Sequence, residues 1–383
     1  MVGISSISST AVNITTVVLC YMLLLNGLGT GKFLNTIKKY YPLYLFFILD
    51  SIVDFFNGYS ATGLDILLYK LLQEFLWPIL IVYAISGNEK KLAKYLLFVF
   101  SVCYAITCFT TYFGNVEYPG ASRALARLTE EGDMTLYAFY KALNIGGVEF
   151  IYQLVLMIPL LIYMIKQSIK SAVLGSLLAF CFISTIIISE YTTALVFSIA
   201  SVLLFFIREE TNFKKLIITL VFVLSFSYVL IYYVDIFDIL SNIVPSGSVA
   251  ERLSDISTSI HGGSVSGGDL DKRQYHWNTS IDMFFSSPIW GTGKYGGEHS
   301  FWLDHLAKYG SIGIILSFIV IRKMYQLTIK EFHNTPFLNY MLFILFAEIG
   351  LMLFNPYQHL QIFSFFVPIF SFVFNHSKYS KNV

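Results

Sequence analysis

Residues 149–165 of the chain read EFIYQLVLMIPLLIYMI, and this stretch decides the class of fold. Its only strongly polar side chains are those of Glu149 and Gln153, and the other residues are hydrophobic. A run of this length is enough to cross the hydrocarbon core of a bilayer as a helix. Because similar runs recur along the chain, we predict an all-α polytopic integral membrane protein with about 11 transmembrane helices.

The composition of the whole chain agrees with this fold class. Of its 383 residues, 56% are hydrophobic and 13% are charged. A soluble domain carries about a quarter charged residues, and half that proportion cannot cover the surface of a globule of this size. The composition therefore excludes a water-soluble enzyme. The net charge of +1 also gives no electrostatic footprint for nucleic acid, so we expect no nucleic-acid partner.

The spans and the basic residues together predict a topology for one membrane domain, 1–383. The predicted spans are 9–28, 42–57, 64–85, 95–113, 149–165, 172–189, 193–207, 216–234, 302–321, 337–354 and 359–375. Sixteen of the 25 Lys and Arg residues fall in short segments on one side, which the positive-inside rule assigns to the cytoplasm. We therefore expect the N-terminus outside, the C-terminus in the cytoplasm, and two long external loops at 114–148 and 235–301.

The first external loop contains a pair of arginines at helical spacing. Arg123 and Arg127 are four residues apart, so on a helix they share one face. Two guanidinium groups at that spacing can bind a pyrophosphate through paired hydrogen bonds. The alternative is an interfacial helix whose arginines contact lipid headgroups or pair with Glu130 and Glu131.

The second external loop has two predicted helices separated by a glycine-rich linker. Residues 248–260 have apolar side chains at helical spacing with Arg252 between them, which is typical of an amphipathic helix at a membrane surface. After the linker 261–268, Asp269 or Asp271 can cap a helix that runs to about 285. On that helix Arg273 and Trp277 share a face.

The end of this loop carries the candidate catalytic residues. His299 stands at the mouth of the ninth predicted span, where a titratable imidazole is a candidate general base. Glu298 is the alternative base, and His305 is a weaker one. The alternative interpretation of His299 is a structural histidine at the interface. We expect no metal, because a zinc site would need cysteines or a closer pair of histidines, and the short cytoplasmic loops leave no room for a nucleotide-binding domain.

Four motifs within residues 273–313 occur in an order typical of one superfamily. They are Arg273-x-x-x-Trp277, Pro288-x-x-Gly291-x-Gly293, His299-Ser300 and Gly310-x-x-Gly313. The region resembles the O-antigen ligase and polymerase superfamily, and the other spans and loops are consistent with it. The turn at 189–193 lacks the arginine that ligases often carry there. This difference, with the divergent composition, favours a Wzy-type polysaccharide repeat-unit polymerase.

The resemblance implies an enzyme of the bacterial cytoplasmic (inner) membrane. Its donor and acceptor would be undecaprenyl-pyrophosphate-linked glycans, joined on the outer side of the membrane by metal-independent inverting glycosyl transfer without a cofactor. His299 or Glu298 would take the proton of the acceptor hydroxyl. The residues expected to bind the substrate and its pyrophosphate are Arg123, Arg127, Arg252, Arg273 and Trp277. The product would be O-antigen, capsule or another exopolysaccharide. A chain-length regulator would be a further candidate partner.

Two other functions stay open at this point. An O-antigen ligase would keep the same fold and site and would transfer the polymer to lipid A core. A membrane transporter or flippase of lipid-linked glycans would account for Asp50, Asp54, Lys70 and Glu74, because ionisable groups inside spans often mark pathways. Against transport, the sequence shows no internal repeat of spans, and its richest polar chemistry lies in an external loop.

Overall fold

The computed structural model describes a large part of the chain between residues 90 and 354. The described residues are 90–131, 133–166, 169–203, 269–297, 299–332 and 337–354, with the isolated positions 38, 41, 45, 48, 49, 52 and 53. Within these ranges the structure is helical and contains no strand. This agrees with the all-α fold that the apolar runs predict.

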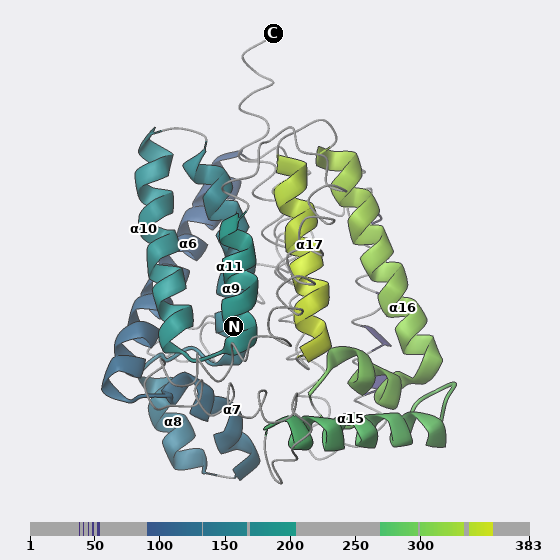
Figure 1. Ribbon diagram of the computed structural model, residues 1–383. Coiled ribbons are helices and arrows are strands. Elements are labelled where there is room, and N and C mark those ends of the chain that lie inside the picture. The colour runs from purple at the N-terminus through teal and green to yellow at the C-terminus, as the bar shows by residue number, and fades with distance from the viewer. Residues whose placement is uncertain are drawn as a thin grey trace, which may run out of the picture.

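The helices form an apolar bundle with further helices at one end (Figure 1). The bundle helices are α6 (Lys90–Glu117), α9 (Val148–Ile165), α10 (Ile169–Ile188), α11 (Thr192–Leu203), α16 (Phe301–Phe332) and α17 (Phe337–Phe354). The helices at its end are α7 (Ala121–Glu131), α8 (Met134–Ala142) and α15 (Asp269–Ser286). Figure 1 shows α7, α8 and α15 at the same end, so parts of both predicted external loops lie on one side of the bundle.

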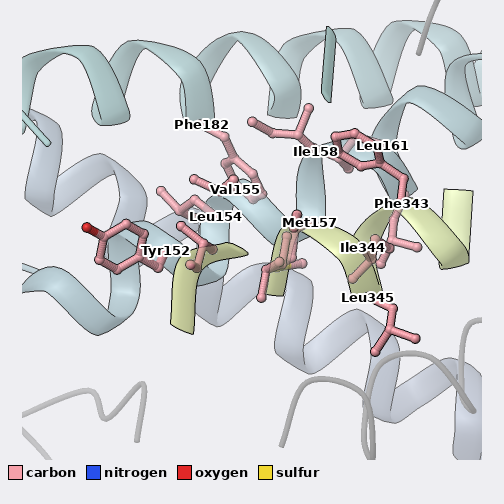
Figure 2. Close-up of a cluster of buried hydrophobic side chains, with 14 of the residues drawn as sticks. Tyr152, Leu154, Val155, Met157, Ile158, Leu161, Phe182, Phe343, Ile344 and Leu345 are labelled. Atoms are coloured by element: carbon pink, nitrogen blue, oxygen red, sulfur yellow. The ribbon is translucent and has the colours of Figure 1, made fainter. Parts of the chain in front are cut away.

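Helix α9 is the centre of the bundle. It packs against α10, α11 and α17, and most of its side chains are buried on all sides. Figure 2 shows Leu154, Val155 and Ile158 of α9 in the same cluster as Phe182 of α10 and Phe343 of α17. The stretch that predicts the fold class therefore forms the protein-facing core of the bundle.

Helices α6 and α10 have the opposite distribution of apolar side chains. Large hydrophobic residues are exposed along both, among them Phe98 and Phe109 on α6 and Leu177 and Phe180 on α10. Continuous apolar surface of this extent is costly in water and is satisfied by lipid. Together with the length of the apolar helices, this face indicates that the protein is embedded in a membrane.

Six of the predicted spans fall on described helices. In the described ranges, three helices are long and apolar enough to cross a membrane: Lys91–Glu117, Val148–Ile165 and Phe301–Lys330. The apolar helices Ala172–Ile188, Thr193–Val202 and Phe337–Leu353 coincide with three further predictions but are shorter. The predicted spans 9–28, 64–85, 216–234 and 359–375 lie outside the described residues, as does 42–57 except at isolated positions.

Two helices differ from the predicted boundaries in ways that matter for the site. Helix α6 continues to Glu117, so the first loop begins later than position 114. Helix α16 continues to Phe332, and it is interrupted at Gly310 by non-helical backbone angles. The ninth predicted span is therefore two helical arms joined by a break, and not one straight helix.

Candidate functional site

The centre of the candidate site is the break in α16. Gly310 has φ +62° and ψ −157°, a combination that is essentially restricted to glycine. The rings of Trp302 and Phe318, one on each arm, lie 5.3 Å apart and are stacked. In a straight helix, residues sixteen positions apart would be separated by about 24 Å along the axis. The two arms are therefore strongly bent toward each other, as Figure 1 shows at the base of α16.

A glycine-rich turn after α15, residues 287–297, supplies the hydrogen bonds that the break in α16 leaves unmade. The N–H groups of Thr292 and Gly293 donate to the carbonyl oxygens of Ala307 and Lys308, at 2.8 and 2.9 Å. In the other direction, the N–H of Ser311 donates to the Pro288 carbonyl oxygen at 2.9 Å, and the Ser311 hydroxyl donates to the same oxygen at 2.8 Å. Buried backbone groups need such partners, so the turn and the break stabilise each other.

The glycines at this junction are required by close packing. A β-carbon on Gly291 would overlap the carbonyl of Lys308 and the nitrogen of Gly310, and one on Gly310 would overlap the carbonyl of Ile289. Gly291 also has φ +74°. The Pro288-x-x-Gly291-x-Gly293 and Gly310-x-x-Gly313 motifs, which are separate in the sequence, are thus two halves of one backbone junction.

A buried carboxylate connects α15 and the turn to the first arm of α16. The hydroxyl of Ser280, on α15, donates to Asp304 Oδ1 at 2.9 Å and accepts the N–H of Gly297 at 2.8 Å. The N–H of Ser300 donates to Asp304 Oδ2 at 3.2 Å. Ser280, Ser300 and Asp304 are each at most 3% exposed. His299 lies within the short segment that these hydrogen bonds hold.

The two histidines closest to the turn lie face to edge. The ring centroids of His299 and His276, which comes from α15, are 4.3 Å apart with an interplanar angle of 67°. His299 is half-buried, so its ring is within reach of a ligand at the end of the bundle. Glu298, the alternative base, lies outside the described residues.

His305 has a different environment from His299. It is 3% exposed, and its ring lies 3.7 Å from the ring of Phe301. Its Nδ1 is 2.8 Å from the Phe301 carbonyl oxygen, and because a carbonyl only accepts, Nδ1 is the protonated nitrogen in this contact. Burial and this internal hydrogen bond favour a structural role for His305, and leave His299 as the better candidate base of the two.

A lysine that the sequence did not single out is buried beside the turn. Lys308 is 1% exposed, and its Nζ lies 4.0 Å from the centroid of the Tyr295 ring and 4.8 Å from that of Tyr309. Desolvated cation–π contacts of this kind contribute about 2 kcal/mol or more. Tyr295 belongs to the turn. Lys308 therefore contacts the turn twice, through its ammonium group at the Tyr295 ring and through its carbonyl oxygen, which accepts the N–H of Gly293.

The predicted binding residues of the second loop are only partly placed. Trp277 is half-buried on α15, and its Nε1–H reaches no acceptor among the described residues. Arg273 lies on α15 one helical turn before Trp277, and its side chain is not among those that the structure describes. Arg252, with the predicted amphipathic helix 248–260, lies outside the described residues.

The predicted arginine helix of the first loop is α7. Arg123 and Arg127 both lie on α7, four residues apart, and so share a helix face. Arg123 is half-buried, and the side chain of Arg127 is not among those that the structure describes. The start of α7 is fixed through Ser122, whose N–H donates to Asn115 Oδ1 at 3.1 Å and whose carbonyl accepts the Tyr191 phenol at 2.9 Å. These contacts tie α7 to the end of α6 and to the start of α11.

The structure brings together one part of the predicted site. His299 lies with the turn, α15 and the first arm of α16, while Arg123 lies on α7 at the same end of the bundle (Figure 1). The sequence did not assign roles to Ser280, Asp304 and Lys308. The only available signal was the spacing of Asp304 and Lys308, two charged residues four positions apart at the start of an apolar span.

Comparison with other proteins does not add a family assignment. No protein-family profile matches the chain, and no curated protein matches it significantly. Among the described residues, no group of three or more His, Cys, Asp and Glu side chains is arranged to hold a metal ion. The features of the chain that point to a function are the motifs of residues 273–313 and the geometry they adopt.

Proposed function

We propose that this protein is a glycosyltransferase that polymerises lipid-linked oligosaccharide repeat units at the outer face of the bacterial cytoplasmic membrane. Donor and acceptor would both be carried on undecaprenyl pyrophosphate. The product would be a surface polysaccharide such as O-antigen, capsule or another exopolysaccharide. The resemblance of residues 273–313 to the O-antigen ligase and polymerase superfamily suggests this function.

One observation supports the proposal most directly. The motif residues that carry the resemblance are not scattered: the turn with Gly291 and the break at Gly310 share reciprocal backbone hydrogen bonds. His299 lies between Gly297 and Ser300, whose N–H groups donate to Ser280 of α15 and to Asp304 of α16. A half-buried histidine on a rigid backbone at the end of an apolar bundle suits chemistry on a substrate with a lipid tail, because the tail can stay in the bilayer.

The proposed reaction needs a base and a cationic group. The acceptor hydroxyl would form a bond to the anomeric carbon of the donor sugar, and the bond from that carbon to the pyrophosphate oxygen would break. His299 would take the hydroxyl proton, which neutral imidazole can do near pH 7. Undecaprenyl pyrophosphate would leave with the bonding electrons, and the guanidinium groups of Arg123, Arg127, Arg252 and Arg273 would stabilise its charge. Displacement from the opposite face predicts inversion at the anomeric carbon.

Two alternatives use the same structure differently. A ligase would transfer a finished polymer to lipid A core through the same histidine and arginines. A transporter of lipid-linked glycans would need a pathway along ionisable groups in spans two and three, which lie outside the described residues apart from isolated positions. We favour the polymerase because the turn at 189–193 carries no arginine.

The test compares surface and lipid-linked glycans from three strains on a gel. These are a deletion strain, the same strain with the wild-type protein, and the same strain with His299→Ala at equal protein level. We expect the deletion and His299→Ala strains to produce single repeat units instead of a ladder. Asn278→Ala, an exposed change on α15, serves as the control and should restore the full ladder.

Other outcomes of this gel would reject the proposal in distinct ways. Long undecaprenyl-linked chains that fail to reach the final acceptor would identify a ligase. An unchanged ladder in the deletion strain would exclude both enzymes and would turn attention to transport. A full ladder with His299→Ala alone would reject His299 as the base and leave Glu298 as the candidate.

A further inference from the structure

The segment that carries His299 is held at both of its ends by the same pair of buried side chains. Its first residue, Gly297, donates its N–H to the Ser280 hydroxyl, and its last residue, Ser300, donates its N–H to Asp304 Oδ2. Ser280 and Asp304 are joined to each other by a hydrogen bond of 2.9 Å. A single polar unit from α15 and α16 therefore holds the backbone N–H groups of Gly297 and Ser300, which flank His299.

Packing around this unit leaves the backbone little freedom to move. A β-carbon on Gly296 would overlap the side chain of Ser280, and one on Gly297 would overlap the backbone of His276. The C-terminal end of the turn thus lies directly on α15, with Gly296 and Gly297 against the helical turn between His276 and Ser280. The same contact brings the His299 ring to 4.3 Å from the His276 ring.

A helix cap alone does not account for this arrangement. The N-terminus of α16 requires acceptors for its first N–H groups, and the Asp304 carboxylate provides one for the N–H of Ser300, the residue that precedes the helix. That function needs nothing from α15. The additional hydrogen bonds of Ser280, to Asp304 and from the N–H of Gly297, connect the start of α16 to α15. Their effect is to hold both ends of the segment that contains His299.

We propose that Ser280 and Asp304 are positioning residues, which keep His299 where it acts on substrate. This inference rests on the proposed function for the role of His299. The hydrogen bonds to a buried carboxylate are charge-assisted and directional, which suits them to hold a backbone segment in one place. A misplacement of a catalytic group by 1 Å can reduce turnover by about a hundredfold, so loss of this unit should affect catalysis more than binding.

The first experiment measures backbone position independently of any activity. Hydrogen exchange of the full-length protein in detergent, read by mass spectrometry, reports the amides of Gly297 and Ser300. We expect Ser280→Ala to speed exchange in this segment by about tenfold, since each factor of ten corresponds to 1.4 kcal/mol of lost protection. Asp304→Asn should speed exchange at 297–300, because the side-chain amide keeps one accepting oxygen in place of two and cannot accept from both the Ser280 hydroxyl and the Ser300 N–H.

Two matched controls separate this effect from general destabilisation. Thr279→Ala removes a neighbouring hydroxyl on α15 that donates to the Tyr275 carbonyl within the helix. Asp282→Asn neutralises an exposed carboxylate on the same helix. Both should leave exchange at 297–300 within about twofold of wild type. Faster exchange throughout α9 in Ser280→Ala would mean that this variant is destabilised as a whole. In that case exchange at 297–300 in the conservative Asp304→Asn variant is the test of the proposal.

The second experiment measures turnover with lipid-linked repeat units extracted from the host strain. We expect Ser280→Ala and Asp304→Asn to lower kcat by about ten- to a hundredfold. We expect KM to stay within about threefold of wild type. Unchanged exchange at 297–300 in both variants would overturn the proposal. So would faster exchange with full kcat in a protein that His299→Ala inactivates. Faster exchange combined with a fully active His299→Ala protein would reject His299 as the base, and with it the positioning role, and would leave Ser280 and Asp304 with a role in the backbone alone.

Discussion

At the scale of single residues, Gly310 and Gly120 show how a positive φ angle can have different consequences. Both have positive φ, +62° and +76°. A β-carbon on Gly120 would meet nothing within 4 Å, whereas one on Gly310 would overlap the Ile289 carbonyl and the nitrogen of Gly291. The first position therefore requires glycine for backbone conformation alone, and the second requires it for packing as well.

This difference predicts unequal effects of substitution by alanine. Gly120→Ala should lower the free energy of unfolding by about 1–2 kcal/mol, which is the strain of a left-handed residue. Gly310→Ala should cost about 4 kcal/mol or more, because the junction between the turn and α16 must also separate. Denaturant titration of both purified variants in detergent measures the two costs, and equal losses would show that Gly310 is not in close contact with the turn.

At this scale the sequence predicts His299 as a candidate base but does not predict the residues that hold it. The histidine is visible as a titratable side chain beside a span. Asp304 is visible only as a charge, because its partner Ser280 comes from α15, 24 positions earlier, and a sequence does not show which groups will meet. Gly310 was recognised as part of a motif, but its positive φ was not, since an isolated glycine in an apolar run is compatible with a straight helix.

At the scale of elements, α7 shows how an external helix is fixed to the bundle. The phenol of Tyr191, at the start of α11, donates to the Ser122 carbonyl across 69 positions of sequence. The side-chain amide of Asn115 donates to the Ser122 hydroxyl at 2.7 Å. The spacing of Arg123 and Arg127 predicted the helix itself, but it contained no information about this attachment, which depends on tertiary contacts.

Removing the phenol should loosen α7 without unfolding the bundle. Tyr191→Phe keeps the aromatic ring and loses the hydrogen bond to Ser122, so we expect a cost of about 1 kcal/mol. Amide exchange should become faster in Ala121–Glu131 and stay unchanged in α15. Tyr275→Phe, on an exposed side chain of α15, is the control and should change neither. Unchanged exchange in α7 of the Tyr191→Phe protein would mean that other contacts fix the helix.

At the scale of the whole molecule, the apolar runs predict helices but not the direction in which each helix faces. Helices α9 and α10 are both strongly apolar, yet Leu154 of α9 is fully buried and Leu177 of α10 is 60% exposed. Hydropathy does not distinguish these positions, because lipid tails are as apolar as leucine. Only the arrangement of the bundle shows that α9 faces protein and that α10 presents a face to lipid.

A matched pair of leucine substitutions tests this arrangement. Leu154→Ala should leave a cavity between α9 and its neighbours and should cost about 3 kcal/mol. Leu177→Ala should cost less than about 1 kcal/mol, since lipid or detergent can fill the space of the lost side chain in the folded protein. Unfolding of both variants in the same detergent gives the comparison. Equal costs would contradict a central α9, because they would place the two leucines in equivalent surroundings and the bundle would need a different order of helices.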